Sequence, residues 1–185
     1  MLKTKSQIVP VDELLQELKG NIFPYWMKKM VDEEHGGFYG KRDGHDKLVK
    51  DAPKAIILNT RILWTFSYAA RTFSEPSCLK IADRAYHYIL DHFLDKVNGG
   101  VYWTVDFEGR PFQTKKQVYA QAFAIYALTE YYLATNDRAS LDEAAVSRAC
   151  ASSSAPRRPR QASMAAAAMP MPTIASALRV RASAW

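Results

Sequence analysis

An arginine lies in the middle of the most apolar stretch of the sequence, and its side chain is the first candidate for chemistry. Arg61 falls within the run from residue 55 to residue 73, where three of its four neighbours one helical turn away are apolar. A guanidinium group does not lose its proton, so on such a face it needs an anionic or polar partner. Two interpretations follow: a structural ion pair with a neighbouring helix, or a contact with a substrate oxygen in a cavity.

A second polar interruption favours the cavity. The sequence predicts another apolar helix from Gln117 to Thr135, and we align its Tyr119-Ala120-Gln121 with Asn59-Thr60-Arg61. A single polar group in an apolar helix is usually satisfied within the core. Two polar triplets at equivalent places indicate inner helices that line a shared polar pocket, with Arg61 and Tyr119 on its wall.

An internal repeat positions these two helices. A segment with two adjacent glycines, an aromatic residue and flanking aspartates occurs twice, each residue of the second copy 63 positions after the first. Both copies follow a predicted helix and lead through a Lys-containing linker into another. Such a unit of about 60 residues buries its faces against its neighbours, as in repeat architectures. The matching residues are Asp32, Gly36, Gly37, Tyr39 and Asp43, then Asp95, Gly99, Gly100, Tyr102 and Asp106.

Periodicity and turn residues give the expected element bounds. A first helix opens with Asp12 as a candidate cap and has a break or kink near residues 21–24, because of Pro24. Short hairpins follow the glycine pairs. The later helices are predicted at residues 55–73, 77–95 and 117–135, and a fifth begins near residue 140.

Charge and composition exclude several classes of protein. The formal charge of +6 comes entirely from residues 145–185, which hold six Arg and no Asp, Glu or Lys; residues 1–144 hold 19 basic and 19 acidic side chains. A neutral body of this kind does not predict binding to nucleic acid or to a membrane surface. Cys78 and Cys150 have no metal-ligand spacing. The N-terminus lacks the apolar segment of a secretion signal, so we expect a cytoplasmic location.

Four stretches together resemble the N-acylglucosamine 2-epimerase and cellobiose 2-epimerase family, and the cellobiose branch more closely. The resemblance covers residues 10–144. It implies an all-α fold, namely the N-terminal part of an (α/α)6 barrel of twelve helices with short Gly-Gly hairpins between helices, formed here by residues 1–144. The matching stretches are NIFPYWMKKMVDEEHGGFYG, ILNTRILWTFSYAARTF, NGGVYWTVDFEGRP and KKQVYAQAFAIYALTEYYLATND.

The implied reaction inverts carbon 2 of the reducing-end glucose of a β-1,4-disaccharide, and it uses no metal or nucleotide cofactor. The opened sugar loses its C2 proton, passes through an enediolate and is reprotonated on the other face, so two acid/base groups are needed. In this family two histidines do that work. By the resemblance, Arg61 is the arginine that holds the C1 and C2 oxygens, and Tyr119 is the tyrosine that lines the sugar site.

The catalytic histidines of the family do not carry over to this sequence. His35 and His45 flank the first hairpin, where we expect loop or capping roles, and His87 and His92 lie on a predicted outer helix. The family's histidines belong to later inner helices. The chain is therefore expected to be the N-terminal third of such an enzyme and to be inactive alone.

The sequence changes character at residue 145. Among residues 145–185 there are 13 Ala, 7 Ser, 6 Arg and 4 Pro, and every Phe and Tyr of the chain precedes this segment. An out-of-frame reading of a GC-rich gene gives this composition, and a genuine low-complexity tail is the alternative. In either case we expect no fixed packing, because large apolar residues are too few to offset the cost of ordering the chain.

The sequence is also compatible with other functions, and it predicts self-association. A sugar isomerase or an N-acylglucosamine 2-epimerase would use the same barrel, as would a glycoside hydrolase, although no inward-facing carboxylate pair appears on the two inner helices. A helical-repeat module that binds glycans or a protein partner is the non-enzyme alternative. An uncovered barrel interior, exposing Trp64, Phe66, Phe123 and Ile125, predicts non-specific self-association.

Overall fold

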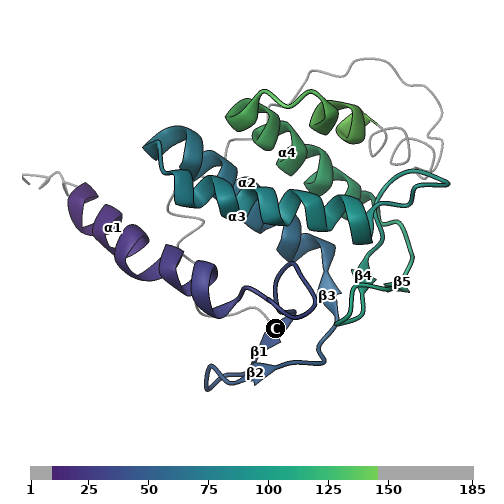
Figure 1. The fold of residues 1–185 in the computed structure, drawn as a ribbon, viewed down its shortest axis with the longest axis horizontal. Coiled ribbons are helices and arrows are strands. Elements are labelled where there is room, and N and C mark those ends of the chain that lie inside the picture. The colour runs from purple at the N-terminus through teal and green to yellow at the C-terminus, as the bar shows by residue number, and fades with distance from the viewer. Residues whose placement is uncertain (1–9, 146–185) are drawn as a thin grey trace, which may run out of the picture.

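The computed structural model describes residues 10–145, in which four long helices are linked by short strands (Figure 1). The all-α fold with short hairpins that the sequence predicts is confirmed for this part of the chain. Residues 1–9 and most of the segment 145–185 lie outside the described residues, so the expectation of an unpacked tail stays a prediction. The helices are α1 (Val11–Glu17), α2 (Ile56–Phe73), α3 (Pro76–Tyr88) and α4 (Val118–Thr135); the strands are β1 (Lys41–Arg42), β2 (Leu48–Val49), β3 (Lys54–Ala55), β4 (Thr104–Val105) and β5 (Pro111–Gln113).

The first helix continues through the proline that was expected to break it. After α1 the chain stays helical, with π-helical turns at Leu18–Ile22 and Tyr25–Lys29 on either side of Phe23 and Pro24. The wider turns shift the hydrogen-bond register, so the missing N–H of the proline does not end the helix. The expected break at residues 21–24 is therefore wrong, and the alternative expectation of a kink there stays a prediction. Asp12 lies inside the first turn and makes no capping hydrogen bond.

The later helices agree with their predicted bounds to within two residues. α2 and α4 each span 18 residues, and α3 continues through a π-helical turn at Ile89–Phe93. Residues 139–145 are again helical, where the fifth helix was expected. No helix within residues 10–145 is both long and apolar enough to cross a bilayer.

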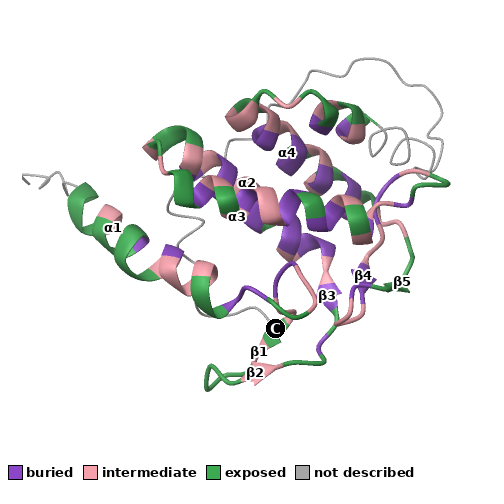
Figure 2. Ribbon diagram, viewed as in Figure 1, coloured by how far each residue is buried: buried purple, intermediate pink, exposed green. Residues whose placement is uncertain are grey.

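α2 is the central element of the described chain. It packs against α3 on one side and α4 on the other (Figure 1), and it carries the most continuous band of buried residues (Figure 2). The aromatic ring of Phe66 lies 5.3 Å from that of Phe23 and is almost fully buried. The expectation that Phe66 is exposed is therefore wrong, because the segment after α1 covers it. Trp64, Phe123 and Ile125 are only partly buried.

The first hairpin, residues 30–55, is held by a buried ion pair that we call the first clasp, Asp32 and Lys54. The Lys54 ammonium lies 2.8 Å from the Asp32 carboxylate and donates a hydrogen bond of 2.8 Å to the carbonyl of Gly36. The other carboxylate oxygen of Asp32 accepts from the backbone N–H groups of Glu34 and His35. The clasp therefore ties the start of α2 to the glycine turn.

The second hairpin, residues 93–117, repeats this arrangement. Lys116 lies 2.6 Å from the Asp95 carboxylate and donates to the carbonyl of Gly99 at 2.6 Å; we call this pair the second clasp. Asp95 accepts from the backbone N–H groups of Val97 and Asn98. From the sequence, the two linkers were described only as containing lysine. In the structure one lysine of each linker has the same role, because it fixes a glycine turn against the following helix.

Two further features join and align the repeats. β3 of the first linker pairs antiparallel with β4, and β4 pairs with β5, so one small sheet crosses from one unit to the next. The lysines of the clasps and the first residues of α2 and α4 are separated by 62 positions, one fewer than the hairpins. The linker of the second unit is therefore one residue shorter than that of the first.

Candidate functional site

Arg61 projects from α2 onto the exposed face between α2 and α4. Its guanidinium carbon lies 5.3 Å from the centroid of the Phe123 ring on α4, a cation–π contact. No carboxylate within residues 10–145 forms an ion pair with Arg61. Of the two interpretations of this residue, the structural ion pair therefore receives no support from the described part of the chain. Because Arg61 is exposed, its guanidinium donors are open to a ligand.

Tyr119 lies on the same surface, at the start of α4. Its side chain is half exposed, and its ring centroid is 4.8 Å from that of Phe123. Arg61 and Tyr119 come from different helices, and Phe123 contacts both. The structure thus brings the two predicted site residues together around one aromatic ring, which the sequence pattern had placed on the apolar side of the helix.

The register on which the two helices were compared is wrong by two residues. Because α2 and α4 start 62 positions apart, Asn59 corresponds to Gln121 and Arg61 corresponds to Phe123. The expected correspondence of Asn59 with Tyr119 fails because the sequence alone does not fix where each linker ends. With the correct register, Phe123 would have been identified as the residue at Arg61's position in the next unit.

Three of the polar side chains in the two triplets have structural roles instead of lining a pocket. The Gln121 amide donates to the carbonyl of Val101 at 2.8 Å and accepts from its N–H at 2.9 Å, so it fastens the second hairpin to α4. Asn59 donates to the carbonyl of Ala55, the last residue of β3, and Thr60 donates to that of Ile56 within α2. These three side chains are buried. Of the two triplets, only Arg61 and Tyr119 therefore reach the exposed surface between α2 and α4.

An aromatic ladder continues the surface away from Arg61. The Trp64 indole is stacked between Tyr68 and Tyr126, at 5.2 Å from each ring centroid. Beyond it, Arg71 donates two hydrogen bonds to Glu130, at 3.0 and 2.8 Å. Burial raises the pKa of the Tyr126 hydroxyl, and the nearby Glu130 carboxylate adds to this. Because both faces of Trp64 are occupied, this indole is a spacer between α2 and α4.

The carboxylates and histidines lie away from this surface. Glu130 is the one acidic residue on α2 and α4, and Arg71 neutralises it. His87 and His92 are on or just after α3, and a ring nitrogen of each bonds a backbone carbonyl, that of Asp83 and that of Gly109. His35 packs its ring edge against Phe107. His45 lies in the exposed turn between β1 and β2. This agrees with the structural roles expected of the histidines.

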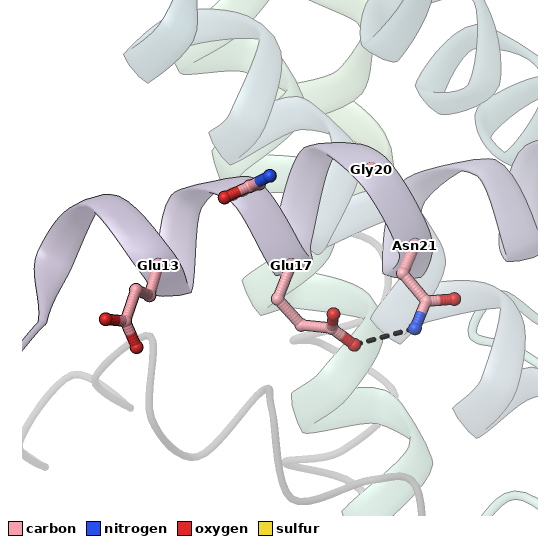
Figure 3. A pocket seen from close by; sticks show the side chains of 5 residues that line it. Glu13, Glu17, Gly20 and Asn21 are labelled. Carbon is pink, nitrogen blue, oxygen red and sulfur yellow. Dashed lines mark hydrogen bonds between the residues drawn. The ribbon is translucent and has the colours of Figure 1, made fainter.

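Neither the hollow along α1 nor a group of metal ligands adds a second candidate. Figure 3 shows a shallow hollow along α1 and the turn after it, where the Asn21 amide donates to the Glu17 carboxylate at 2.7 Å. It lies on the outside of the helix and includes neither Arg61 nor Tyr119. No group of three His, Cys, Asp or Glu side chains within residues 10–145 is arranged to hold a metal ion.

Comparisons with known proteins agree on one family. Residues 36–168 match the family model of N-acylglucosamine 2-epimerase. Cellobiose 2-epimerase from Bacteroides fragilis is 50% identical over 125 residues, which are 68% of this chain and 32% of that protein. Cellobiose 2-epimerase from Ruminococcus albus is 45% identical over 131 residues, 71% of this chain and 33% of that protein.

Solved structures give the same result. The cellobiose 2-epimerase of Bacillus thermoamylovorans superposes with a TM-score of 0.73 at 41% identity, covering 75% of this chain and 36% of that one. The described residues are thus the N-terminal part of an α/α barrel. The chain spans about a third of the length of the curated relatives that it matches.

Proposed function

Because the chain belongs to the N-acylglucosamine 2-epimerase family, we propose that it forms the part of a cellobiose 2-epimerase site that holds the reducing-end sugar. The observation that carries this is the meeting of Arg61 and Tyr119 around Phe123 on one exposed surface. The substrate class is a β-1,4-linked disaccharide with a free reducing end, and the reaction is inversion at its carbon 2.

Arg61 has the chemistry that an enediolate needs. When the C2 proton leaves, negative charge develops on the oxygens of carbons 1 and 2, and a guanidinium fork donates to two such oxygens at once. Its position over the Phe123 ring limits the rotamers of a long side chain, so fewer conformations are lost when it binds. The Tyr119 hydroxyl, on the same surface, can donate to a sugar hydroxyl.

The proton transfers need groups that this surface does not supply. An arginine is not a base near neutral pH, and the four histidines of the sequence lie at the hairpins and on or just after α3. Glu130 is held by Arg71. We infer that the 185-residue chain binds the sugar without exchanging its C2 proton.

Two measurements on the full chain test this proposal. Saturation-transfer NMR should detect cellobiose, and Arg61→Ala should weaken binding by about 10- to 100-fold, since a hydrogen bond to a charged group contributes roughly 1.5–3 kcal/mol. Thr72→Ala, exposed on the last turn of α2, is the matched control. Unchanged binding by Arg61→Ala would overturn the assignment of Arg61.

Incubation with cellobiose in deuterated water tests the chemistry. We expect no deuterium at carbon 2 with this chain, and exchange with the full-length Bacteroides fragilis relative as positive control. Exchange above the buffer rate would show that a base is present and overturn the division of roles. Release of glucose would point instead to a hydrolase that works with two carboxylates. The same assay with N-acetylglucosamine tests the other substrate class of the family.

A further inference from the structure

A hollow of about 190 Å³, which we call the hairpin hollow, lies where the two hairpins meet. Three separate segments of the chain build it: the glycine turn of the first hairpin with the residue after its strand bridge, the linker between β2 and β3, and the turn between β4 and β5. The hollow along α1, in contrast, is lined by one continuous helical segment. The residues that line the hairpin hollow are Glu34, His35, Tyr39, Lys50, Asp51 and Phe107.

The rings of the hairpin hollow are partly buried and held in place. The His35 ring meets the Phe107 ring edge to face at 5.3 Å, and its Nδ1 lies 3.8 Å from the Asp32 carboxylate of the first clasp. The backbone N–H of Tyr39 donates to the carbonyl of Met30 at 2.8 Å. Burial raises the pKa of the Tyr39 hydroxyl, and nearby carboxylates add to this, so the hydroxyl remains a donor at neutral pH.

The charged side chains of the hairpin hollow are not neutralised by one another. Glu34, Lys50 and Asp51 are exposed, and none of them forms an ion pair within residues 10–145. Glu33, the residue before Glu34, is by contrast paired with Arg84. Opposite charges that line one hollow without meeting can bind a ligand that carries both hydrogen-bond donors and acceptors.

The internal repeat shows that a hairpin of this design forms without these charges. The clasp and the glycine pair recur in the second hairpin, but the three charged side chains do not. Val97 stands at the position of Glu34, and the positions of Lys50 and Asp51 fall within residues 112–114, which are Phe, Gln and Thr. The charges are therefore an addition to the first hairpin, and a role in binding accounts for them.

We propose that the hairpin hollow binds a single neutral pyranose ring. A pyranose presents C–H groups that pack on aromatic rings, and its hydroxyls donate to carboxylates and accept from an ammonium group. The hollow is smaller than the pockets of about 300–1,000 Å³ that hold drug-sized ligands, so it suits one ring. Two carboxylates and one ammonium give it a net negative charge, which disfavours a phosphorylated or acidic sugar.

This site goes beyond the proposed reducing-end site, because the hairpin hollow includes neither Arg61 nor Tyr119. NMR titration of the ¹⁵N-labelled 185-residue chain with methyl β-D-glucopyranoside tests it. This probe has no free reducing end and therefore lies outside the substrate class proposed for the Arg61 surface. The amide signals of residues 34–39, 50–51 and 107 should shift and saturate with a Kd of about 1–10 mM.

Matched variants assign the binding to the hairpin hollow. Asp51→Ala and Phe107→Ala should each weaken it by about 10-fold, through loss of a charged acceptor and of a ring. Asp142→Ala and Phe112→Ala remove an exposed carboxylate and an exposed ring elsewhere and should leave it unchanged. Circular dichroism verifies each fold, and Phe107→Leu, which keeps apolar volume without the ring, replaces Phe107→Ala if that variant unfolds.

The two proposed sites fail independently. Arg61→Ala should leave the titration with methyl β-D-glucopyranoside unchanged, whatever its effect on cellobiose, and a loss in this variant would mean that the probe binds at the Arg61 surface instead. Methyl β-D-glucopyranosiduronate, which adds a carboxylate, should bind more weakly than the neutral probe. No saturable shift up to about 100 mM probe, equal losses in the control variants, or tighter binding of the acidic probe would each overturn the proposal.

Discussion

The two hairpins of the chain share one design but differ in how deeply it is buried. The first clasp has both side chains 1% exposed, whereas in the second Asp95 and Lys116 are 7% and 18% exposed. The difference comes from α3. Arg84 donates to the backbone carbonyls of Asp32 and Gly37, and the Tyr88 ring lies 4.9 Å from the Lys54 ammonium.

The second hairpin has no such cover from the corresponding positions of the sequence. Moving Arg84 and Tyr88 forward by 62 residues leads to Val146 and Cys150, which have neither a guanidinium nor an aromatic ring. Local sequence therefore builds both clasps, and the neighbouring helix decides how strongly each pair is removed from water. This contrast predicts different responses to the same substitutions.

The largest difference is expected on removing the lysines. Lys54→Met leaves the Asp32 carboxylate buried without its counter-charge, and breaking a buried pair in this way costs about 3–5 kcal/mol of unfolding free energy. Lys116→Met should cost roughly 1–2 kcal/mol, because water reaches the second clasp and screens it. Urea unfolding followed by circular dichroism measures both. Equal losses would mean that the cover by α3 has no energetic effect.

Glycine substitutions in the first hairpin should give the next largest effect. A Cβ added to Gly37 would come within 2.6 Å of the Tyr88 ring, at a φ of +61°. Gly37→Ala should therefore cost about 2–4 kcal/mol, from the left-handed backbone and from the clash. Gly36→Ala has the left-handed backbone with ordinary contacts at 3.5 Å, and Gly44→Ala has open space around its Cβ.

The three alanine variants separate strain from clash. The expected order of loss in urea midpoint is Gly37→Ala, then Gly36→Ala, then Gly44→Ala. If Gly37→Ala and Gly36→Ala lose the same stability, the packing of Tyr88 on the hairpin contributes nothing and backbone strain alone remains.

The next effect is smaller, and here the second hairpin is the one held more firmly. Gln121 satisfies both backbone groups of Val101, so Gln121→Asn, one methylene shorter, should cost about 1–3 kcal/mol. Asn59, its equivalent in α2, reaches only the carbonyl of Ala55, and its side-chain oxygen has no partner within the described residues. Asn59→Gln should add up to roughly 1 kcal/mol by reaching Phe38, the residue equivalent to Val101.

Hydrogen exchange of the amides of Phe38 and Val101 measures this pair of changes directly. Protection of Val101 should fall in Gln121→Asn, and protection of Phe38 should rise in Asn59→Gln. Unchanged exchange at Val101 would contradict the role assigned to Gln121. A loss of stability in Asn59→Gln would show that the core around α2 has no room for the extra methylene.

Acid should weaken both clasps, and this is the smallest effect expected. The Lys116 ammonium and the backbone N–H of Asn98 hold the pKa of Asp95 well below its usual range. Burial acts to raise the pKa of Asp32, but Lys54 and the N–H of His35 outweigh it, so this pKa is also lowered. Carboxylates with a lowered pKa in the folded state stabilise the fold above the unfolded pKa, and they lose that contribution as pH falls through the folded value.

The test is the urea midpoint between about pH 6 and about pH 2. Stability should be constant down to about pH 4 and should then decline, and Asp95→Asn should flatten the decline. A parent chain whose midpoint does not change below about pH 4 would contradict a lowered pKa for Asp32 and Asp95 in the folded state.

Much of the architecture follows from the sequence alone. The glycine pairs, the aspartates that accept N–H bonds in the turns, and the apolar periodicity act over a few residues, so they fix the hairpins and the bounds of α2, α3 and α4. Local pattern and family resemblance also predict Arg61 and Tyr119 as site residues, and the binding and exchange measurements test their functional roles.

Only the tertiary structure decided which side chains meet. The packing of α4 on α2 makes Phe123 the contact partner of Arg61, and the packing of α4 on the second hairpin makes Gln121 a fastening for Val101 instead of a pocket residue. The burial of Phe66 depends on a segment about 40 positions away in the chain. Contacts of this range depend on how whole helices pack, and helical periodicity does not specify which neighbour covers which face. The burial of each clasp is decided in the same way, by whether side chains of a neighbouring helix cover it.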